Sequence, residues 1–137
     1  MNINFNDRVY LVTGGASGIG AAVVHYLAQH NGRAVIADIN DEAGAALVAQ
    51  YPWQLRYLHT DVTQFAHLQA ACDLAEKTFG GLDGAVNSAG IGSLGTVADM
   101  PVAEWHKVID IDLHGVFHAC RAALPLLRKR GGGSIVN

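Results

Sequence analysis

Five short apolar runs are spaced along the chain, and none of them alternates apolar with polar residues. Four of the five are rich in Val or Ile, and the third offers Tyr57 and Leu58 instead. A run without alternation predicts a strand that is buried on both faces, as in a parallel sheet covered by helices. The predicted strands are residues 9–12, 34–37, 56–58, 84–86 and 134–136.

Between these runs, apolar residues recur at the three-to-four-residue spacing of helices. One stripe starts at Ile19 and ends at Asn31-Gly32, and a second runs from a predicted N-cap at Thr63 to Gly80-Gly81. A shorter helix fits residues 41–50. A long one fits 102 to about 130, where Pro125 is expected to kink or shorten the last turns.

Strands and helices therefore alternate, which predicts an α/β fold of the Rossmann type: a doubly wound parallel sheet with helices on both faces. The chain has 137 residues, of which 50% are hydrophobic and 15% charged. This length and composition suit one domain spanning residues 1–137.

The charge distribution argues against nucleic acid and membrane partners. The formal net charge is −3, and the only cationic cluster, residues 128–130, falls where the long helix is expected to end. The polar opening at residues 1–8 has no signal-like apolar segment, and no apolar run has the length of a membrane span. We expect a cytoplasmic protein.

The two cysteines and two tryptophans fit a packed interior. Cys72 and Cys120 each lie within a helical pattern, without the spacing of a disulfide framework or a metal site, and are expected to be reduced core thiols. Trp53 and Trp105 are expected to be packing residues.

The segment TGGASGIG, residues 13–20, joins the first predicted strand to the first predicted helix. Glycines at such a turn let the backbone approach a ligand, and the helix N-terminus offers free amides to a phosphate. The spacing is neither GxGxxG nor GxxxxGK[ST]. A pyrophosphate site is the favoured interpretation, and a plain connecting turn is the alternative.

Asp38 ends the second predicted strand, 24 residues after Gly14. A carboxylate at this point can accept hydrogen bonds from both hydroxyls of an adenosine ribose. The alternative is an N-cap for the following helix. The 2′-phosphate of NADP would require a cation nearby, and none is present among Gly15, Ala16, Ser17, Ile39 and Asn40. The prediction is therefore NAD rather than NADP.

Together with Asp61-Val62 after the third strand and Asn87-Ser88-Ala89-Gly90 after the fourth, these motifs resemble the short-chain dehydrogenase/reductase family. The similarity is to its compact single-domain branch with the TGxxxGxG turn and covers essentially the whole chain. The strongest evidence for this resemblance is the order in which the four motifs follow the ends of the predicted strands. The family implies a sheet of strand order 3-2-1-4-5.

The resemblance implies a set of cofactor-binding residues. Asp38 and Ile39 would hold the adenosine ribose, while Asp61 and Val62 would flank the adenine. For Asp61 the alternative is a turn acid capping the helix near Thr63. Asn87 would brace neighbouring backbone, and Ser88 replaces the second Asn of the family's NNAG. The remaining positions are Gly14, Ser17, Gly18, Ile19 and Gly20 at the pyrophosphate, and Ala89 and Gly90 at the nicotinamide ribose.

The family's catalytic pair is a tyrosine followed by a lysine four residues later. None of Tyr10, Tyr26, Tyr51 and Tyr57 has such a lysine, and residues 133–137 resemble the family's strand just before its catalytic serine. We therefore expect an NAD-dependent dehydrogenase acting on an alcohol or ketone as the complete protein. These 137 residues alone are expected to be inactive and to bind NADH weakly at most.

Two alternatives stay open at this point. One is a non-catalytic dinucleotide-binding or scaffolding protein that ends at Asn137. The other is a relative that modifies nucleotide sugars, although such members usually have a different glycine spacing and a longer chain.

Asp112 stands where the family carries the asparagine of its catalytic tetrad, because Asp112-Leu113-His114-Gly115 replaces Asn-Leu-x-Gly. It is the one candidate catalytic residue of the chain. The alternative is a surface or ion-paired acid without a catalytic part.

The long helix at 102–130 carries two further expectations. His114 and His118 have the spacing of a metal pair but lack a third ligand, so no metal is predicted. The helix is apolar on more than one face, and in the family it packs against a partner subunit. A homo-oligomer, dimer or tetramer, is expected through this helix, with a fully buried helix as the alternative. Only residues 91–100 are expected to border the substrate site.

Overall fold

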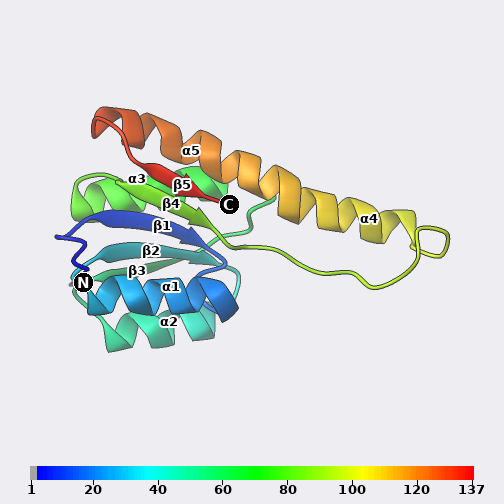
Figure 1. Cartoon of the computed structure of the whole chain (residues 1–137), viewed down its shortest axis with the longest axis horizontal. Coiled ribbons are helices and arrows are strands. Elements are labelled where there is room, and N and C mark those ends of the chain that lie inside the picture. The colour runs from blue at the N-terminus through cyan, green and yellow to red at the C-terminus, as the bar shows by residue number, and fades with distance from the viewer. Residues whose placement is uncertain (1–2) are drawn as a thin grey trace.

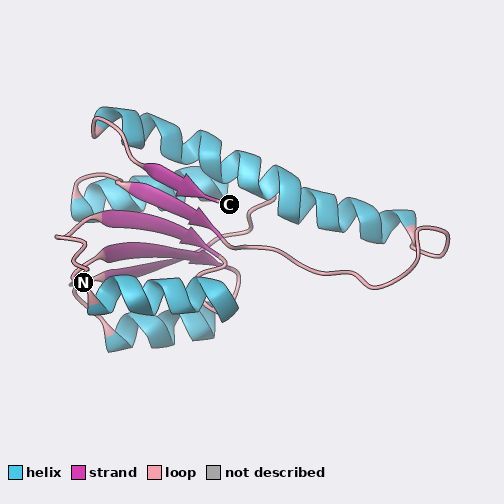
Figure 2. Cartoon of the chain, in the orientation of Figure 1, coloured by secondary structure: helices cyan, strands magenta, loops and turns pink. Residues whose placement is uncertain are grey.

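The computed structural model describes residues 3–137, so Met1 and Asn2 of the polar opening lie outside the described part. It contains one five-stranded sheet in the order β3-β2-β1-β4-β5, in which every neighbouring pair is parallel. All the arrows of the sheet point the same way in Figure 2. The predicted fold class and strand order are confirmed. The strands are β1 (Val9–Thr13), β2 (Arg33–Asp38), β3 (Leu55–His59), β4 (Gly84–Asn87) and β5 (Ser134–Val136).

Helices cover both faces of the sheet, as Figure 1 shows. They are α1 (Gly18–Gln29), α2 (Asp41–Gln50), α3 (Phe65–Phe79), α4 (Val102–Ile109), the π-helical segment η1 (Asp110–His114) and α5 (Gly115–Lys129). On one face α1 and α2 pack on Val12, Ala34 and Ile36; on the other, α3 and α5 pack on Leu11 and Val35. Successive strand residues point to opposite faces, and here both faces are buried. This is why the strands read as continuous apolar runs.

The start of α3 differs from the expectation. The helix begins at Phe65 with Gln64 as its N-cap, so the prediction of Thr63 as N-cap is wrong. The Thr63 hydroxyl donates instead to the Asp61 carboxylate, at 2.7 Å. Thr63 therefore closes a turn in front of the helix. At the other end Gly80 is the C-cap with φ +84°, as the Gly80-Gly81 stop predicted.

The predicted long helix is continuous from Val102 to Lys129 but contains the π-helical segment η1. Pro125 lies inside α5, which continues past it for another turn. Figure 1 shows α4 projecting beyond the sheet, together with the loop that leads to it from β4. None of the α4 residues, all of which the structure describes, is buried.

The cysteines and tryptophans divide between interior and surface. Cys72 is buried and Cys120 half-buried, and within residues 3–137 both are free thiols. Burial raises the pKa of the Cys72 thiol to about 12. The expectation that the tryptophans are packing residues is wrong, because Trp53 is 84% exposed and Trp105 55% exposed. A single tryptophan gives no periodic signal from which its burial can be inferred.

Among residues 3–137, no helix has both the length and the apolar character needed to cross a membrane.

Removal of a core side chain tests this placement of the sheet. Leu11 in β1 is fully buried, whereas Leu94 in the loop after β4 is fully exposed. We expect Leu11→Ala to lower the free energy of unfolding by about 2–5 kcal/mol, because it leaves a cavity in the core. The same change at Leu94 is expected to stay within about 0.5 kcal/mol. Urea unfolding followed by circular dichroism measures both, and equal losses would contradict the described core.

Candidate functional site

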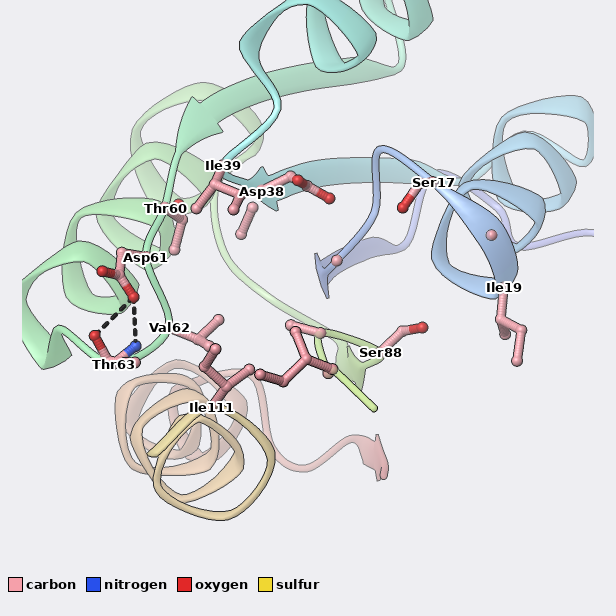
Figure 3. A pocket seen from close by; sticks show the side chains of 16 residues that line it. Ser17, Ile19, Asp38, Ile39, Thr60, Asp61, Val62, Thr63, Ser88 and Ile111 are labelled. Atoms are coloured by element: carbon pink, nitrogen blue, oxygen red, sulfur yellow. Dashed lines mark hydrogen bonds between the residues drawn. The ribbon is translucent and has the colours of Figure 1, made fainter. Parts of the chain in front are cut away.

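A cavity of about 500 Å³ lies at the carboxyl ends of β1, β2, β3 and β4. This is the edge of an open parallel sheet where ligands bind, since the loops there diverge to the two faces. Figure 3 shows the side chains around it. The lining residues are Gly14, Ser17, Gly18, Ile19, Ala37, Asp38, Ile39, Thr60, Asp61, Val62, Thr63, Ser88, Ala89, Gly90, Ile91 and Ile111.

The turn after β1 packs against the segment after β4. Gly14 has φ +62°, and a Cβ atom there would lie 2.7 Å from the Cα atom of Ala89. Only glycine satisfies both conditions. The Gly14 N–H also donates to the carbonyl oxygen of Ala37 at 2.9 Å, which fixes the turn to β2. The turn is therefore held by both neighbouring strands.

Helix α1 begins at Gly18, with Ser17 as its N-cap. The Ser17 side chain makes no capping hydrogen bond with the part of the chain that the structure describes, which leaves amides of the first turn available. Both residues line the cavity. A helix N-terminus beside a glycine turn is a site suited to a phosphate group.

Gly20 does not line the cavity, unlike the other glycines predicted for the pyrophosphate. A Cβ atom at this position would lie 2.1 Å from the carbonyl oxygen of Gly14. Gly20 thus allows α1 to pack directly on the turn. The glycine spacing identified the turn but did not distinguish its cavity-lining positions from its packing position.

The Asp38 carboxylate is fixed between the glycine turn and the start of the next helix. Its Oδ2 atom accepts from the Ala16 N–H at 2.9 Å, and its Oδ1 atom accepts from the Asn40 N–H at 3.0 Å. Figure 3 shows the carboxylate pointing toward the segment that carries Ser17. Each oxygen keeps a further lone pair for a ligand hydroxyl. The N-cap of α2 is Asn40, whose Oδ1 atom accepts from the Ala43 N–H, so the interpretation of Asp38 as an N-cap is wrong.

Asp61 closes the turn that follows β3. Its Oδ1 atom accepts from the Thr63 hydroxyl at 2.7 Å and from the Thr63 N–H at 2.9 Å, as the dashed lines in Figure 3 show. The Thr63 hydroxyl bond is the main reason why the pKa of the Asp61 carboxyl lies below its ordinary value. Asp61 is therefore a turn acid, as the alternative interpretation held, but it does not cap α3, because the helix begins at Phe65 without a side-chain cap. It lines the cavity as well.

Val62 forms an apolar wall of the cavity. Its side chain faces Ile111 of η1 across one side of the cavity in Figure 3. Its carbonyl oxygen accepts from His118 Nδ1 at 2.8 Å. A Cβ atom at Gly115 would lie 2.7 Å from Val62 Cγ2, so this glycine lets α5 approach closely. The apolar side chains of Val62 and Ile111, which line the same cavity as Asp38, suit contact with an aromatic base.

Asn87 does not line the cavity, and it binds different partners from those expected. Its Nδ2 atom donates to Asn137 Oδ1 at 2.7 Å and to Cys120 Sγ at 3.5 Å, so it joins side chains and not backbone. Its Oδ1 atom is buried and has no hydrogen-bond partner within residues 3–137. Ser88, Ala89 and Gly90, which follow it, all line the cavity.

Asp112 lies outside the cavity lining but holds a residue that belongs to it. Its Oδ1 atom accepts from the Ile91 N–H at 2.9 Å. A Cβ atom on Gly90 would be 3.4 Å from the same oxygen, so the side chain lies directly against the loop after β4. Among the described residues Asp112 forms no ion pair. It therefore joins η1 to this loop, which neither sequence interpretation anticipated.

The two histidines of the long helix serve separate contacts. His114 Nδ1 pairs with Asp110 Oδ1 at 2.9 Å within η1, whereas His118 bonds to the Val62 carbonyl. No group of three His, Cys, Asp or Glu side chains suited to a metal ion occurs among residues 3–137.

Several lining residues were not predicted from the sequence. Ala37 and Thr60 directly precede Asp38 and Asp61, so the strand-end rule that found the acids also applies to them. Ile91 falls in the stretch expected to border the substrate site. Ile111 reaches the cavity only because the long helix packs beside Val62, which no local pattern announces.

The fold and the cavity define a doubly wound α/β protein with a nucleotide-type crevice at its strand ends. Residues 8–137 match the model of the short chain dehydrogenase family. The chain belongs to this family, as its motifs predicted.

Characterised relatives share the similarity along nearly the whole chain. The 3-alpha-(or 20-beta)-hydroxysteroid dehydrogenase of Mycobacterium tuberculosis is 43% identical over 130 residues, covering 95% of this chain and 50% of that protein. The trans-4-hydroxycyclohexanecarboxylate dehydrogenase of Sinomonas cyclohexanicum is 39% identical over 140 residues, covering 96% of this chain and 54% of that protein. The chain thus spans about half the length of the curated relatives it matches.

Solved structures agree on the fold. A short chain dehydrogenase/reductase from Burkholderia phymatum, crystallised in complex with NAD, superposes with a TM-score of 0.92 at 29% identity. The match covers 98% of this chain and 50% of that one. A short-chain type dehydrogenase/reductase from Mycobacterium ulcerans also gives a TM-score of 0.92 at 29% identity, covering 97% of this chain and 51% of that one.

The Asp61–Thr63 turn predicts a measurable pKa change. We expect Thr63→Val to raise the pKa of Asp61, because the substitution removes the hydroxyl bond to the ionised carboxylate. A lowered pKa stabilises the fold above the ordinary carboxyl pKa of about 3.9, and this contribution is lost as the pH falls through the lowered value. Thr63→Val should therefore lose this contribution to the free energy of unfolding, and its stability should depend less on pH in the acid range.

Carboxyl carbon chemical shifts, followed by NMR titration, give the pKa directly. Thr96→Val is a matched control, since the Thr96 hydroxyl donates to Asp99 in the loop after β4. It should leave Asp61 unchanged. An identical Asp61 titration in wild type and Thr63→Val would rule out the described turn.

Proposed function

We propose that this chain is the cofactor-binding part of an NAD-dependent oxidoreductase that transfers a hydride between NAD(H) and an alcohol or ketone in the cytoplasm. One observation carries the proposal: the glycine turn, the Asp38 carboxylate and the Asp61-Val62 turn meet around a single cavity. The relatives named for hydroxysteroid and hydroxycyclohexanecarboxylate dehydrogenation support an alcohol or ketone as the substrate class.

The residues of the cavity have the chemistry that a nicotinamide dinucleotide needs. Gly18 and Ile19, the first two residues of α1, line the cavity, and the Ser17 side chain does not cap this helix start, so a pyrophosphate would find amide donors there. Asp38 offers free lone pairs to ribose hydroxyls, and Val62 offers an apolar surface to adenine. Ala89 and Gly90 leave room for the nicotinamide ribose. When bound, the cofactor supplies the hydride acceptor or donor of the reaction.

Asp38 also supports NAD over NADP. A 2′-phosphate would place its negative charge against this carboxylate, and no Lys or Arg is among the described residues that line the cavity. Ile39 beside it is apolar and 67% exposed, so the neighbouring position offers no charge either.

The roles proposed for the other residues follow from their contacts. The side chain of Asp112 fixes the Ile91 N–H, so we assign it to positioning of the loop after β4 at the site where the family carries its asparagine. The family's proton-donating Tyr-x-x-x-Lys pair is absent from the 137 residues. The proposed reaction needs a proton donor of this kind, and these 137 residues do not supply one in that motif.

The DNA sequence after the codon for Asn137 distinguishes the enzyme from a non-catalytic dinucleotide-binding protein. Codons after Asn137 that continue into a serine and a Tyr-x-x-x-Lys motif would support the enzyme. A stop codon at that point would support a non-catalytic dinucleotide-binding protein.

Cofactor preference is the first test of the site. We expect the full-length protein to bind NADH at least about tenfold more tightly than NADPH, because Asp38 bonds the ribose hydroxyls and repels a phosphate. In Asp38→Ala the NADH affinity should fall by about 10- to 100-fold, since a charge-assisted hydrogen bond is lost. Fluorescence titration of NADH and NADPH measures both values.

Asp73→Ala is the matched control, because Asp73 is an exposed acid on α3 outside the cavity. It removes the same charge and should leave both affinities unchanged. A wild-type preference for NADPH would refute the role of Asp38.

We also propose that the protein is a homo-oligomer that associates through the long helix at 102–130. Five large apolar side chains of this helix are exposed, and an apolar surface of this kind marks a protein interface. They are Val102, Trp105, Leu113, Phe117 and Leu124. Their exposure differs from the alternative of a fully buried helix.

Oligomeric state tests this surface. We expect Phe117→Glu to dissociate the oligomer, because it places a charge in the apolar contact. Light scattering after size-exclusion chromatography of the full-length protein gives the mass. Leu94→Glu introduces the same charge in an exposed loop and should leave the mass unchanged. An oligomer that survives Phe117→Glu would place the interface elsewhere.

A further inference from the structure

We infer that His67 is a positioning residue for the adenine wall of the cavity: its neutral ring holds the Asp61-Val62 turn in place, and protonation of the ring releases it. Nucleotide affinity should then fall as the pH drops through the titration range of histidine. The inference rests on the proposed function, in which Asp61 and Val62 flank the adenine.

The ring of His67 supplies the acceptor for a backbone group at the edge of the cavity. The Asp61 N–H donates to His67 Nδ1 at 3.1 Å. This amide lies just beyond the sheet, because the Thr60 N–H makes the preceding bond, to the Asp38 carbonyl oxygen. An imidazole therefore takes the place of the next strand as hydrogen-bond partner. The turn therefore depends, at this amide, on a side chain from the first turn of α3.

The rest of the turn is closed by bonds that do not titrate near neutral pH. The Gln64 N–H donates to the Asp61 carbonyl oxygen, and the His67 N–H donates to the Gln64 carbonyl oxygen, each at 3.0 Å. The Asp61 carboxylate accepts from Thr63. Within this turn, the bond to the imidazole is therefore the one whose existence depends on a proton that moves between about pH 5 and 8.

The hydrogen bond from Asp61 determines the protonation state of the His67 ring. A ring nitrogen that accepts a hydrogen bond must carry a lone pair, so His67 is neutral here with its proton on Nε2. In the imidazolium form, Nδ1 carries a hydrogen that would face the Asp61 N–H, donor against donor. Protonation thus removes the bond and leaves an amide without its acceptor.

Charges on three segments face the ring and act in opposite directions. The Asp61 carboxylate in the turn favours protonation. The N-terminus of α3, where His67 is the third residue, disfavours a cation. The ring of His59 at the end of β3 has its centroid 6.4 Å away and is bonded to Asp41 of α2 at 2.7 Å, so a charged His59 also opposes protonation.

The consequence for binding passes through the backbone. Asp61 lies between Thr60 and Val62, which are both buried and both line the cavity. Freeing its N–H lets the turn shift and misplaces the Val62 side chain that supports the base. We expect an affinity loss on the order of tenfold, the usual scale for one unsatisfied amide bond.

Binding of ADP-ribose to the full-length protein, measured by calorimetry from about pH 8 to pH 5.5, tests the inference in the histidine range. This probe contains the adenine and the pyrophosphate and does not itself titrate in the range. We expect the wild-type affinity to fall on the order of tenfold with decreasing pH. His67→Asn keeps an acceptor oxygen near the Nδ1 position and does not titrate, so it should bind as wild type at pH 8 and show a flat profile.

Two further variants complete the comparison. His67→Ala lacks the acceptor and should be weak at every pH, with an equally flat profile. His59→Asn is the matched control: it removes the neighbouring imidazole but not the bond to Asp61, so the pH dependence should persist. Nitrogen NMR of the wild-type ring should show the Nε2–H form at pH 8.

The outcomes separate this inference from the proposed function. Absence of ADP-ribose binding at pH 8 would overturn the proposed function itself. Tight binding with a flat wild-type profile, a pH dependence retained in His67→Asn, or an Nδ1–H ring at pH 8 would overturn the role of His67 and leave the proposed function standing.

Discussion

The parallel pairing of β1 with both β2 and β4 is the constraint on which the site depends. In this register Thr13 lies opposite Ala37 on one side and opposite Asn87 on the other. The three strands therefore end at the same level, and the segments that follow them emerge side by side. The glycine turn, Asp38 and Ser88 are neighbours for this reason, although up to 74 residues of chain separate them.

Close backbone packing then gives the cavity its form. Gly14 packs on Ala89 and Gly20 packs on the Gly14 carbonyl, at distances that would not accommodate a Cβ atom. Asp38, at the end of β2, joins the glycine turn by accepting a hydrogen bond from the Ala16 N–H. The two glycines thus shape the site by allowing neighbouring backbone to approach closely. The Asp38 carboxylate is held by the backbone of the glycine turn.

Much of this arrangement could be predicted from the sequence, because parallel strands buried on both faces give apolar runs that stand out. The strand order and the acids at strand ends followed from the pattern and from the family resemblance. The start of α3 did not, since Thr63 suits an N-cap by residue type but is engaged by Asp61. Gly20 and Asn87 belong to the motifs but do not line the cavity, and Ile111 reaches it only through tertiary packing. Motifs record which residues a turn requires, and not which of them face the ligand.

The bond between Asp112 and the Ile91 N–H joins two segments that line the same side of the cavity, the loop after β4 and η1. Ile91 belongs to the loop and Ile111 to η1, and this bond links the two segments next to the cavity. The position of the long helix on the sheet therefore helps to set the width of the cavity on that side. A shift of this helix would carry the loop after β4 with it.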